Sequence, residues 1–291
     1  MRIPAYWAKG TANETAPDGA ARSFSCWRSS DASQSEAQES ALAAAARILR
    51  ARLSGQRLDR YGYGNVPLRE EVIQRFTSSD GEITAAVTRN AYGALVLNTA
   101  RVMFVDIDFQ EVGAGATLSQ MFGALLGRKP PSPVAPIEQQ EQTARLRVEN
   151  FVRDNPAWNV RVYRTHSGLR LLATHDLFDP TGDETQACFV ALGADPLYTR
   201  LCQAQASFRA RLTPKPWRCG IWKPAVSWPR DTGAAQARFD AWQAKYSASQ
   251  AKYATCRHLA TLGNATMHPD AEVIVKVHDH IARCDAALPL A

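Results

Sequence analysis

The sequence predicts an α+β protein with a central mixed or antiparallel sheet, flanking helices, and helical extensions at the N- and C-terminal ends. Short apolar runs bounded by turn residues predict strands, and they lie at 83–89, 94–99 and 102–109. Alternating residues around a tight glycine turn predict a β-hairpin, with strands at 159–165 and 169–174. Apolar residues at helical spacing predict helices, and the first two lie at 36–53 and 138–153.

The remaining elements follow from local signals along the chain. Residues 1–35 are rich in Ser, Ala, Thr and Gly and predict an irregular lead-in. A short helix is expected from Pro67 through Phe76, because proline is favoured in a first helical turn. Further helices are predicted at 183–192, 196–209, 234–262 and 269–286.

Two irregular segments complete the pattern, a glycine-rich turn at 61–65 and a stiff proline-rich connection at 128–137. The domain organisation that follows has three parts. They are an N-terminal lead-in at 1–55, an α+β core at 56–230, and a C-terminal helical extension at 231–291.

Composition limits the class of protein. The formal net charge is +6, which favours polyanionic partners such as nucleic acid and nucleoside triphosphates.

The six cysteines have neither the CxxC spacing of a zinc site nor the density of a disulfide scaffold, so we expect reduced thiols. No signal-peptide core and no bilayer-length apolar run is evident. We therefore expect a cytoplasmic protein that does not enter a membrane.

Asp106 and Asp108 stand two residues apart in the apolar run 102–109, so a strand would point both carboxylates to one face. Their mutual repulsion makes burial costly unless a positive group lies between them. A divalent ion such as Mg²⁺ or Mn²⁺ is the simplest solution and indicates phosphate chemistry. Alternatively, Asp108 ends the strand in solvent and Asp106 makes local hydrogen bonds.

The predicted hairpin turn gathers two cations, an imidazole and two hydroxyls around a glycine. Guanidinium, hydroxyl and backbone N–H groups in a tight bend suit an anion, especially a triphosphate. The alternative is a solvated hairpin tip, because turns commonly use these residue types. The candidate phosphate-binding residues are Arg164, Thr165, His166, Ser167, Gly168 and Arg170.

A second basic segment, 208–218, places four cations beside two prolines and a tryptophan. Proline restricts the backbone, so less conformational entropy is lost when the cations engage phosphates. Trp217 is suited to stacking on a base. Alternatively, the arginines pair with acidic side chains and Trp217 belongs to the core. The candidate phosphate-binding residues are Arg209, Arg211, Lys215 and Arg218.

Asp195 is the candidate for a third metal-binding carboxylate, because it follows the hairpin in the chain. An aspartate directly before Pro196 is also typical of a helix N-cap. His278 and His280 are set aside as zinc ligands, since residues two positions apart do not share a helix face.

Three of these segments, taken in order, resemble the motifs of the archaeo-eukaryotic primase superfamily, which includes primase-polymerases. In that family the first motif is a DxD or DxE metal site, the second carries Ser and His that contact the nucleotide, and the third adds an acidic metal ligand. Arg170 stands where the second-motif histidine falls when Ser167 and Gly168 are aligned, and His166 precedes the serine. The matching segments are Asp106-Ile107-Asp108, 165–170, and Asp195 to Arg200 followed by Phe208-Arg209.

The resemblance implies a metal-dependent nucleotidyltransferase. Asp106, Asp108 and Asp195 would hold Mg²⁺ or Mn²⁺, which activates a 3′-hydroxyl and stabilises the pyrophosphate leaving group. The hairpin and the 208–218 segment would bind the triphosphate or the template backbone. Two alternatives remain open: a non-catalytic nucleic-acid-binding relative that lost the second-motif histidine, and a metal-dependent nuclease that uses the same carboxylates.

Overall fold

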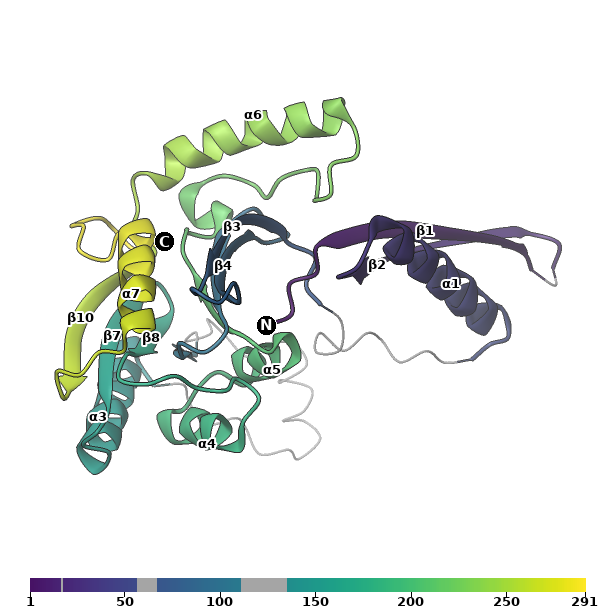
Figure 1. The fold of residues 1–291 in the computed structure, drawn as a ribbon. Coiled ribbons are helices and arrows are strands. Elements are labelled where there is room, and N and C mark those ends of the chain that lie inside the picture. Colours follow the sequence, from purple (N-terminus) through teal and green to yellow (C-terminus); the bar gives the residue numbers. More distant parts are fainter. Residues whose placement is uncertain (17, 57–66, 111–134) are drawn as a thin grey trace, which may run out of the picture. The chain divides into compact units, whose positions relative to one another are not determined.

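The computed structural model describes residues 1–16, 18–56, 67–110 and 135–291. The glycine-rich turn at 61–65 and most of the proline-rich connection lie outside these residues. The described chain divides into two compact units, and Figure 1 labels their helices and strands. Unit 1 contains Met1–Ala100, Arg200–Arg211 and Lys215–Ser249, and unit 2 contains Arg101–Thr199, Leu212–Pro214 and Gln250–Ala291. The α+β prediction is confirmed, and the named strands pair antiparallel throughout.

Unit 1 begins with a β-hairpin, β1 (Tyr6–Thr15) and β2 (Ala21–Ser30), and with helix α1 (Gln34–Leu53). Small residues let the helix approach the strands closely, since Ala8 and Ala41 are buried and a Cβ on Gly10 would overlap the Ala41 backbone. The predicted helix is confirmed. The predicted irregular lead-in was wrong, because these Ser, Ala and Gly-rich residues gain strand pairing from each other and not from local propensity.

The second sheet of unit 1 has four strands in the order β3-β4-β5-β9. The predicted strands at 83–89 and 94–99 are confirmed. The predicted helix from Pro67 to Phe76 was wrong, because β-branched and aromatic residues there form β3. The predicted helix at 196–209 ends early, because its last residues belong to β9. The strands are β3 (Glu71–Thr77), β4 (Ile83–Arg89), β5 (Leu95–Thr99) and β9 (Phe208–Arg211), followed by the 3₁₀ turn η1 (Pro216–Cys219) and helix α6 (Gly233–Gln250).

Unit 2 contains a four-stranded sheet in the order β10-β7-β8-β6. The predicted strand that carries the aspartates and the predicted hairpin are confirmed. The predicted helix 234–262 was wrong in its second half, because α6 ends at Gln250 and an edge strand follows. The strands are β6 (Phe104–Asp108), β7 (Asn159–Thr165), β8 (Gly168–Ala173) and β10 (Cys256–Gly263).

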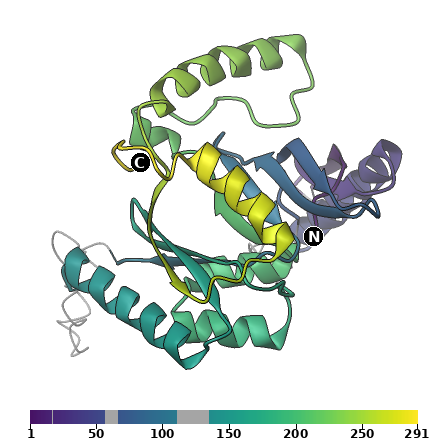
Figure 2. The same ribbon diagram turned by 60° about the vertical axis from the view of Figure 1, so that its left-hand side comes forward.

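Helices cover both faces of this sheet, with α3 and α4 on one face and α7 across the other (Figure 2). On β7 the even-numbered Arg164 contacts Glu141 of α3, while the odd-numbered Tyr163 packs its ring on His278 of α7. Strand alternation therefore assigns Tyr163 and its cross-strand partner Arg170 to the α7 face. The helices of unit 2 are α3 (Ile137–Asp154), α4 (Asp183–Leu192) and α7 (Pro269–Ala282), and α5 (Pro196–Gln205) starts in unit 2 and continues into unit 1.

Among the described helices, none combines the length and the apolar character that a bilayer crossing requires.

Candidate functional site

Asp106 of β6 is held by Arg170, its direct cross-strand partner on β8. Arg170 donates from Nε to Oδ1 at 2.8 Å and from Nη2 to Oδ2 at 3.1 Å. The Arg170 side chain is 2% exposed and that of Asp106 is 26% exposed. Burial disfavours the charged guanidinium, but the Asp106 carboxylate outweighs it and raises the pKa of Arg170. The positive group that this strand carboxylate requires is supplied by a guanidinium.

Asp108 lies two residues further along β6 on the same face of the strand, at its exposed end. Its cross-strand partner is Gly168, the first residue of β8. A Cβ on Gly168 would overlap the carbonyl oxygen of Ile107, so only glycine lets the hairpin approach β6 this closely. The predicted common face of Asp106 and Asp108 therefore agrees with the register of the sheet.

The backbone of Asp195 lies beside β6. Its N–H donates to the carbonyl oxygen of Asp106 at 2.9 Å, and the hydroxyl of Tyr198 donates to the carbonyl oxygen of Phe104 at 2.8 Å. The side chain of Asp195 accepts from the backbone N–H of Tyr198 at 2.7 Å, which is the N-cap contact that the sequence suggested for α5. One residue thus caps the helix and lies against the strand of the other two aspartates.

The hairpin residues do not all gather at Asp106. Arg170 faces α7, whereas Arg164 lies on the opposite face, where its Nε donates to Glu141 Oε2 at 2.8 Å and its Nη1 donates to Gly168 O at 2.9 Å. Arg164 therefore ties the hairpin to α3. His166 at the exposed tip is 3.1 Å from the Ser167 hydroxyl through its Nδ1, and Thr165 is buried.

The four cations of the basic segment belong to unit 1, whereas the aspartates and the hairpin belong to unit 2. Arg209 donates to Glu70 Oε1 at 2.7 Å and to Asn98 Oδ1 at 2.5 Å, so this arginine follows the alternative of pairing with an acid. The alternative of a core tryptophan does not hold, because Trp217 is 49% exposed. The ammonium of Lys215 lies 5.7 Å from the centroid of the Trp217 ring. Arg211 ends β9 and Arg218 lies in η1, both half-buried.

Sequence reasoning missed a third cluster in unit 2, formed by Cys256 of β10, His278 of α7 and Cys284 just after α7. All three side chains are buried. The Cys256 sulfur lies 3.5 Å from that of Cys284 and 3.7 Å from His278 Nε2. These residues share no spacing motif, and the helix wrongly predicted over Cys256 concealed its position beside α7.

Arg170 joins this cluster to Asp106, because its Nη1 lies 3.5 Å from His278 Nε2. A hydrogen bond with Cys284 holds the pKa of the Cys256 thiol well below its usual value, against burial, and His278 lowers it further. Burial disfavours a charged His278, but the neighbouring Cys256 thiolate outweighs it and raises the pKa of His278. The same contact with Cys256, together with burial, raises the pKa of Cys284.

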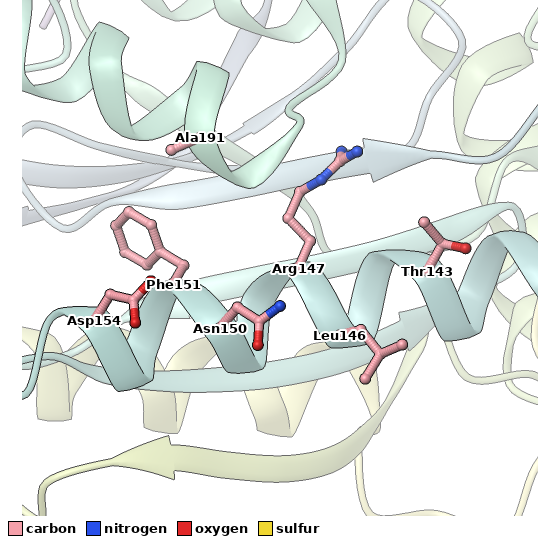
Figure 3. Close-up of a pocket in the computed structure, with 7 residues that line it drawn as sticks. All are labelled: Thr143, Leu146, Arg147, Asn150, Phe151, Asp154 and Ala191. Atoms are coloured by element: carbon pink, nitrogen blue, oxygen red, sulfur yellow. The ribbon is translucent and has the colours of Figure 1, made fainter.

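A separate pocket of about 510 Å³ lies between α3 and α4 (Figure 3). Arg147 and Phe151 of α3 extend toward Ala191 of α4 along its walls. None of the residues that line it is among those predicted to bind metal or phosphate.

Comparison of the chain with models of protein families, with curated proteins and with solved structures finds no match.

Proposed function

We propose that this chain is a divalent-cation-dependent nucleotidyltransferase that acts on nucleic acid with nucleoside triphosphates, in the manner of primase-polymerases. The observation that carries the proposal is the backbone hydrogen bond from Asp195 to Asp106, which brings a third acidic residue to the strand of Asp106 and Asp108. Carboxylates near one another are suited to Mg²⁺ or Mn²⁺, since these ions take carboxylate oxygens and substrate phosphates as ligands. Here the backbone brings Asp195 to Asp106, while the Asp195 side chain accepts from the Tyr198 N–H.

The Arg170 pair is compatible with a metal at Asp106. An ionised carboxylate has about four lone-pair sites, and the bidentate contact uses two of them. Asp106 also keeps 26% of its side chain exposed. In this proposal Arg170 is a positioning residue that fixes the orientation of the carboxylate, while the exposed lone pairs bind the ion. The bound ion would activate the attacking hydroxyl and stabilise the leaving pyrophosphate.

The test is a primer-extension assay with full-length protein, a labelled primer-template, nucleoside triphosphates and Mn²⁺. Asp108→Asn is the most informative variant, because Asp108 is exposed at the end of β6 and asparagine keeps the size and shape of the side chain. We expect extension by the wild type and at least about 100-fold slower extension by Asp108→Asn, the scale of a removed electrostatic contribution. Asp106→Ala combined with Asp108→Ala should abolish turnover while duplex binding persists.

Asp154→Asn is the matched control, because Asp154 is a well exposed acid of the same unit, 67% exposed in its side chain. It should extend primers at the wild-type rate. Extension that survives in the double variant would exclude the metal role. Shortening of the primer in place of extension would identify a nuclease.

A second candidate function is nucleic-acid binding without catalysis. The specific observation in its favour is the bidentate Arg170 contact, which already neutralises Asp106. The exposed Trp217 with Lys215 beside it offers a stacking face with a cation. This function predicts a mobility shift of the primer-template with no change in its length.

The salt dependence of binding separates phosphate contact from other contributions. Replacing Arg211 and Lys215 by Ala should weaken binding to any sequence and reduce the salt slope by roughly one for each lost phosphate contact. Lys276→Ala is the control, because this lysine forms an exposed pair with Glu272 on α7. An unchanged slope in the double variant would remove the phosphate role of this segment.

A further inference from the structure

The buried Cys256, His278 and Cys284 converge on one small volume. Each offers one ligand atom, and these atoms lie within 4.8 Å of one another. Around a tetrahedral zinc, Zn–S bonds of about 2.3 Å and a Zn–N bond of about 2.0 Å place neighbouring ligand atoms roughly 3.6–3.8 Å apart. The observed separations of 3.5 Å between the sulfurs and 3.7 Å between Cys256 Sγ and His278 Nε2 are close to these values, and Cys284 Sγ lies 3.9 Å from the other ring nitrogen, His278 Nδ1.

We propose that Cys256, His278 and Cys284 form a binding site for a thiophilic divalent cation, with zinc as the natural occupant. Two thiolates and one imidazole are a donor set that zinc uses in proteins. The site is distinct from the aspartates of β6, whose oxygen ligands suit harder ions. It does not depend on the proposed nucleotidyl transfer.

The surroundings of His278 match those of a metal ligand. Its Nδ1 lies 2.8 Å from Asp279 Oδ1, and Asp279 Oδ2 in turn accepts from Arg161 Nη2 at 2.7 Å. A histidine that ligates a metal usually donates its other ring N–H to a carboxylate, which fixes the tautomer and the ring orientation. Here that contact leaves Nε2 facing Cys256.

The balance of charges favours the cluster with a divalent ion bound. Two thiolates neutralise a divalent ion, while Asp106 and Asp279 neutralise Arg170 and Arg161. Burial of charge is tolerated when it is paired in this way. A metal would also tie α7 to β10, since the ligands come from the strand, the helix and the second residue after the helix.

The ion would act on the neighbouring Asp106 through Arg170. Because Arg170 Nη1 lies 3.5 Å from His278 Nε2, holding His278 on a metal also fixes the position of one neighbour of Arg170. Arg170 then holds the Asp106 carboxylate from the other side. The three protein ligands leave one tetrahedral position of the ion for water or a further ligand, and the effect of the ion extends to the exposed end of β6.

The experiment measures metal in the full-length protein, purified with a phosphine reductant and supplied with zinc and then dialysed. We expect one zinc per chain by elemental mass spectrometry. Replacement of zinc by Co²⁺ should give the intense near-ultraviolet thiolate charge-transfer absorption of a Cys-ligated ion. Cys256→Ser, Cys284→Ser and His278→Asn should each lose stoichiometric metal.

Cys188→Ser is the matched control, because Cys188 is also a buried thiol of unit 2 but lies on α4, outside the cluster. It should keep one zinc per chain. Asp279→Asn keeps all three ligands and removes only the carboxylate behind His278, so it should weaken zinc binding by about 10–100-fold. This graded loss does not require unfolding, which is checked by circular dichroism.

Three results would overturn the proposal. One is a reduced wild-type protein that holds no stoichiometric zinc and gives no charge-transfer band with Co²⁺. Another is equal loss of metal in Cys188→Ser. The third is a stable Cys256–Cys284 disulfide in the presence of zinc and reductant, detected by alkylation and mass spectrometry, which would make the pair a redox dithiol.

Discussion

In each unit, an arginine on a strand of the four-stranded sheet pairs with a carboxylate. The hydrogen-bond networks around the two pairs differ. In unit 1, Arg209 contacts Glu70 and Asn98, Asn98 Nδ2 donates to Thr88 Oγ1 at 2.9 Å, and the Thr88 hydroxyl donates back to Glu70 at 2.5 Å. These side chains form a closed ring of hydrogen bonds.

In unit 2, Arg170 lies in an open chain. One end is Asp106, whose side chain keeps 26% exposure. The other end is His278, with two thiols beyond it. A closed ring satisfies its own polar groups and serves the fold, whereas an open chain leaves lone pairs and sulfur ligands for other species. The arrangement in unit 2 is therefore the one suited to binding a ligand, although both arginines were candidate phosphate ligands.

The largest expected effect is that of removing Arg170. Arg170→Met leaves Asp106 without its buried counter-charge, and breaking such a pair typically costs about 3–5 kcal/mol. Urea unfolding followed by tryptophan fluorescence measures the loss. Arg153→Met, at a side chain that is 71% exposed, is the control and should change the free energy of unfolding by less than about 0.5 kcal/mol. A cost below about 1 kcal/mol for Arg170→Met would contradict the open chain.

A smaller effect is expected in the closed ring of unit 1. Glu70→Gln removes the charge and keeps only one of the two acceptor oxygens, so either Thr88 or Arg209 loses its acceptor. The loss should be about 1–3 kcal/mol. The same unfolding experiment measures it, with Glu82→Gln as the control at an exposed acid of the same unit. If Glu70→Gln cost more than Arg170→Met, the two networks would not differ as described.

The smallest effect is expected at the helix cap beside β6. Asp195→Ala removes the acceptor for the Tyr198 N–H and should cost about 1 kcal/mol. Ser33→Ala removes the corresponding cap of α1, where Ser33 Oγ accepts from the Glu36 N–H at 3.1 Å, and should cost a similar amount. Only Asp195→Ala should also raise the Mn²⁺ concentration needed for primer extension. Equal Mn²⁺ dependence in both variants would restrict Asp195 to capping.

Local sequence patterns predicted the elements whose structure is decided by their own residues. Helix 183–192 and strand 83–89 have the bounds that their residues indicate, and the hairpin differs by one residue at the start and end of its second strand. The strands β1, β2, β3, β9 and β10 were missed. The local patterns there indicated an irregular segment or a helix, whereas pairing with a neighbouring strand decides the structure. In β10, Ala and Leu favour a helix, but hydrogen bonding to β7 stabilises a strand.

The same limit applies to the candidate site. Strand alternation predicted that Asp106 and Asp108 share a face, and the order of the chain suggested Asp195. That Arg170 pairs with Asp106 could not be predicted, because the register between β6 and β8 joins residues 64 positions apart. The Cys256 and Cys284 sulfurs meet only because β10 lies beside α7.

Some backbone groups on both outer strands of the unit 2 sheet have hydrogen-bond partners outside the sheet. Carbonyl oxygens of β6 accept from the Asp195 N–H and the Tyr198 hydroxyl, while on β10 the His258 N–H donates to the Cys284 carbonyl. An incoming peptide that extends a sheet needs such backbone groups, and fibril growth uses the same edges. At these positions both routes are blocked, so a ligand of unit 2 must be recognised there by side chains and charge.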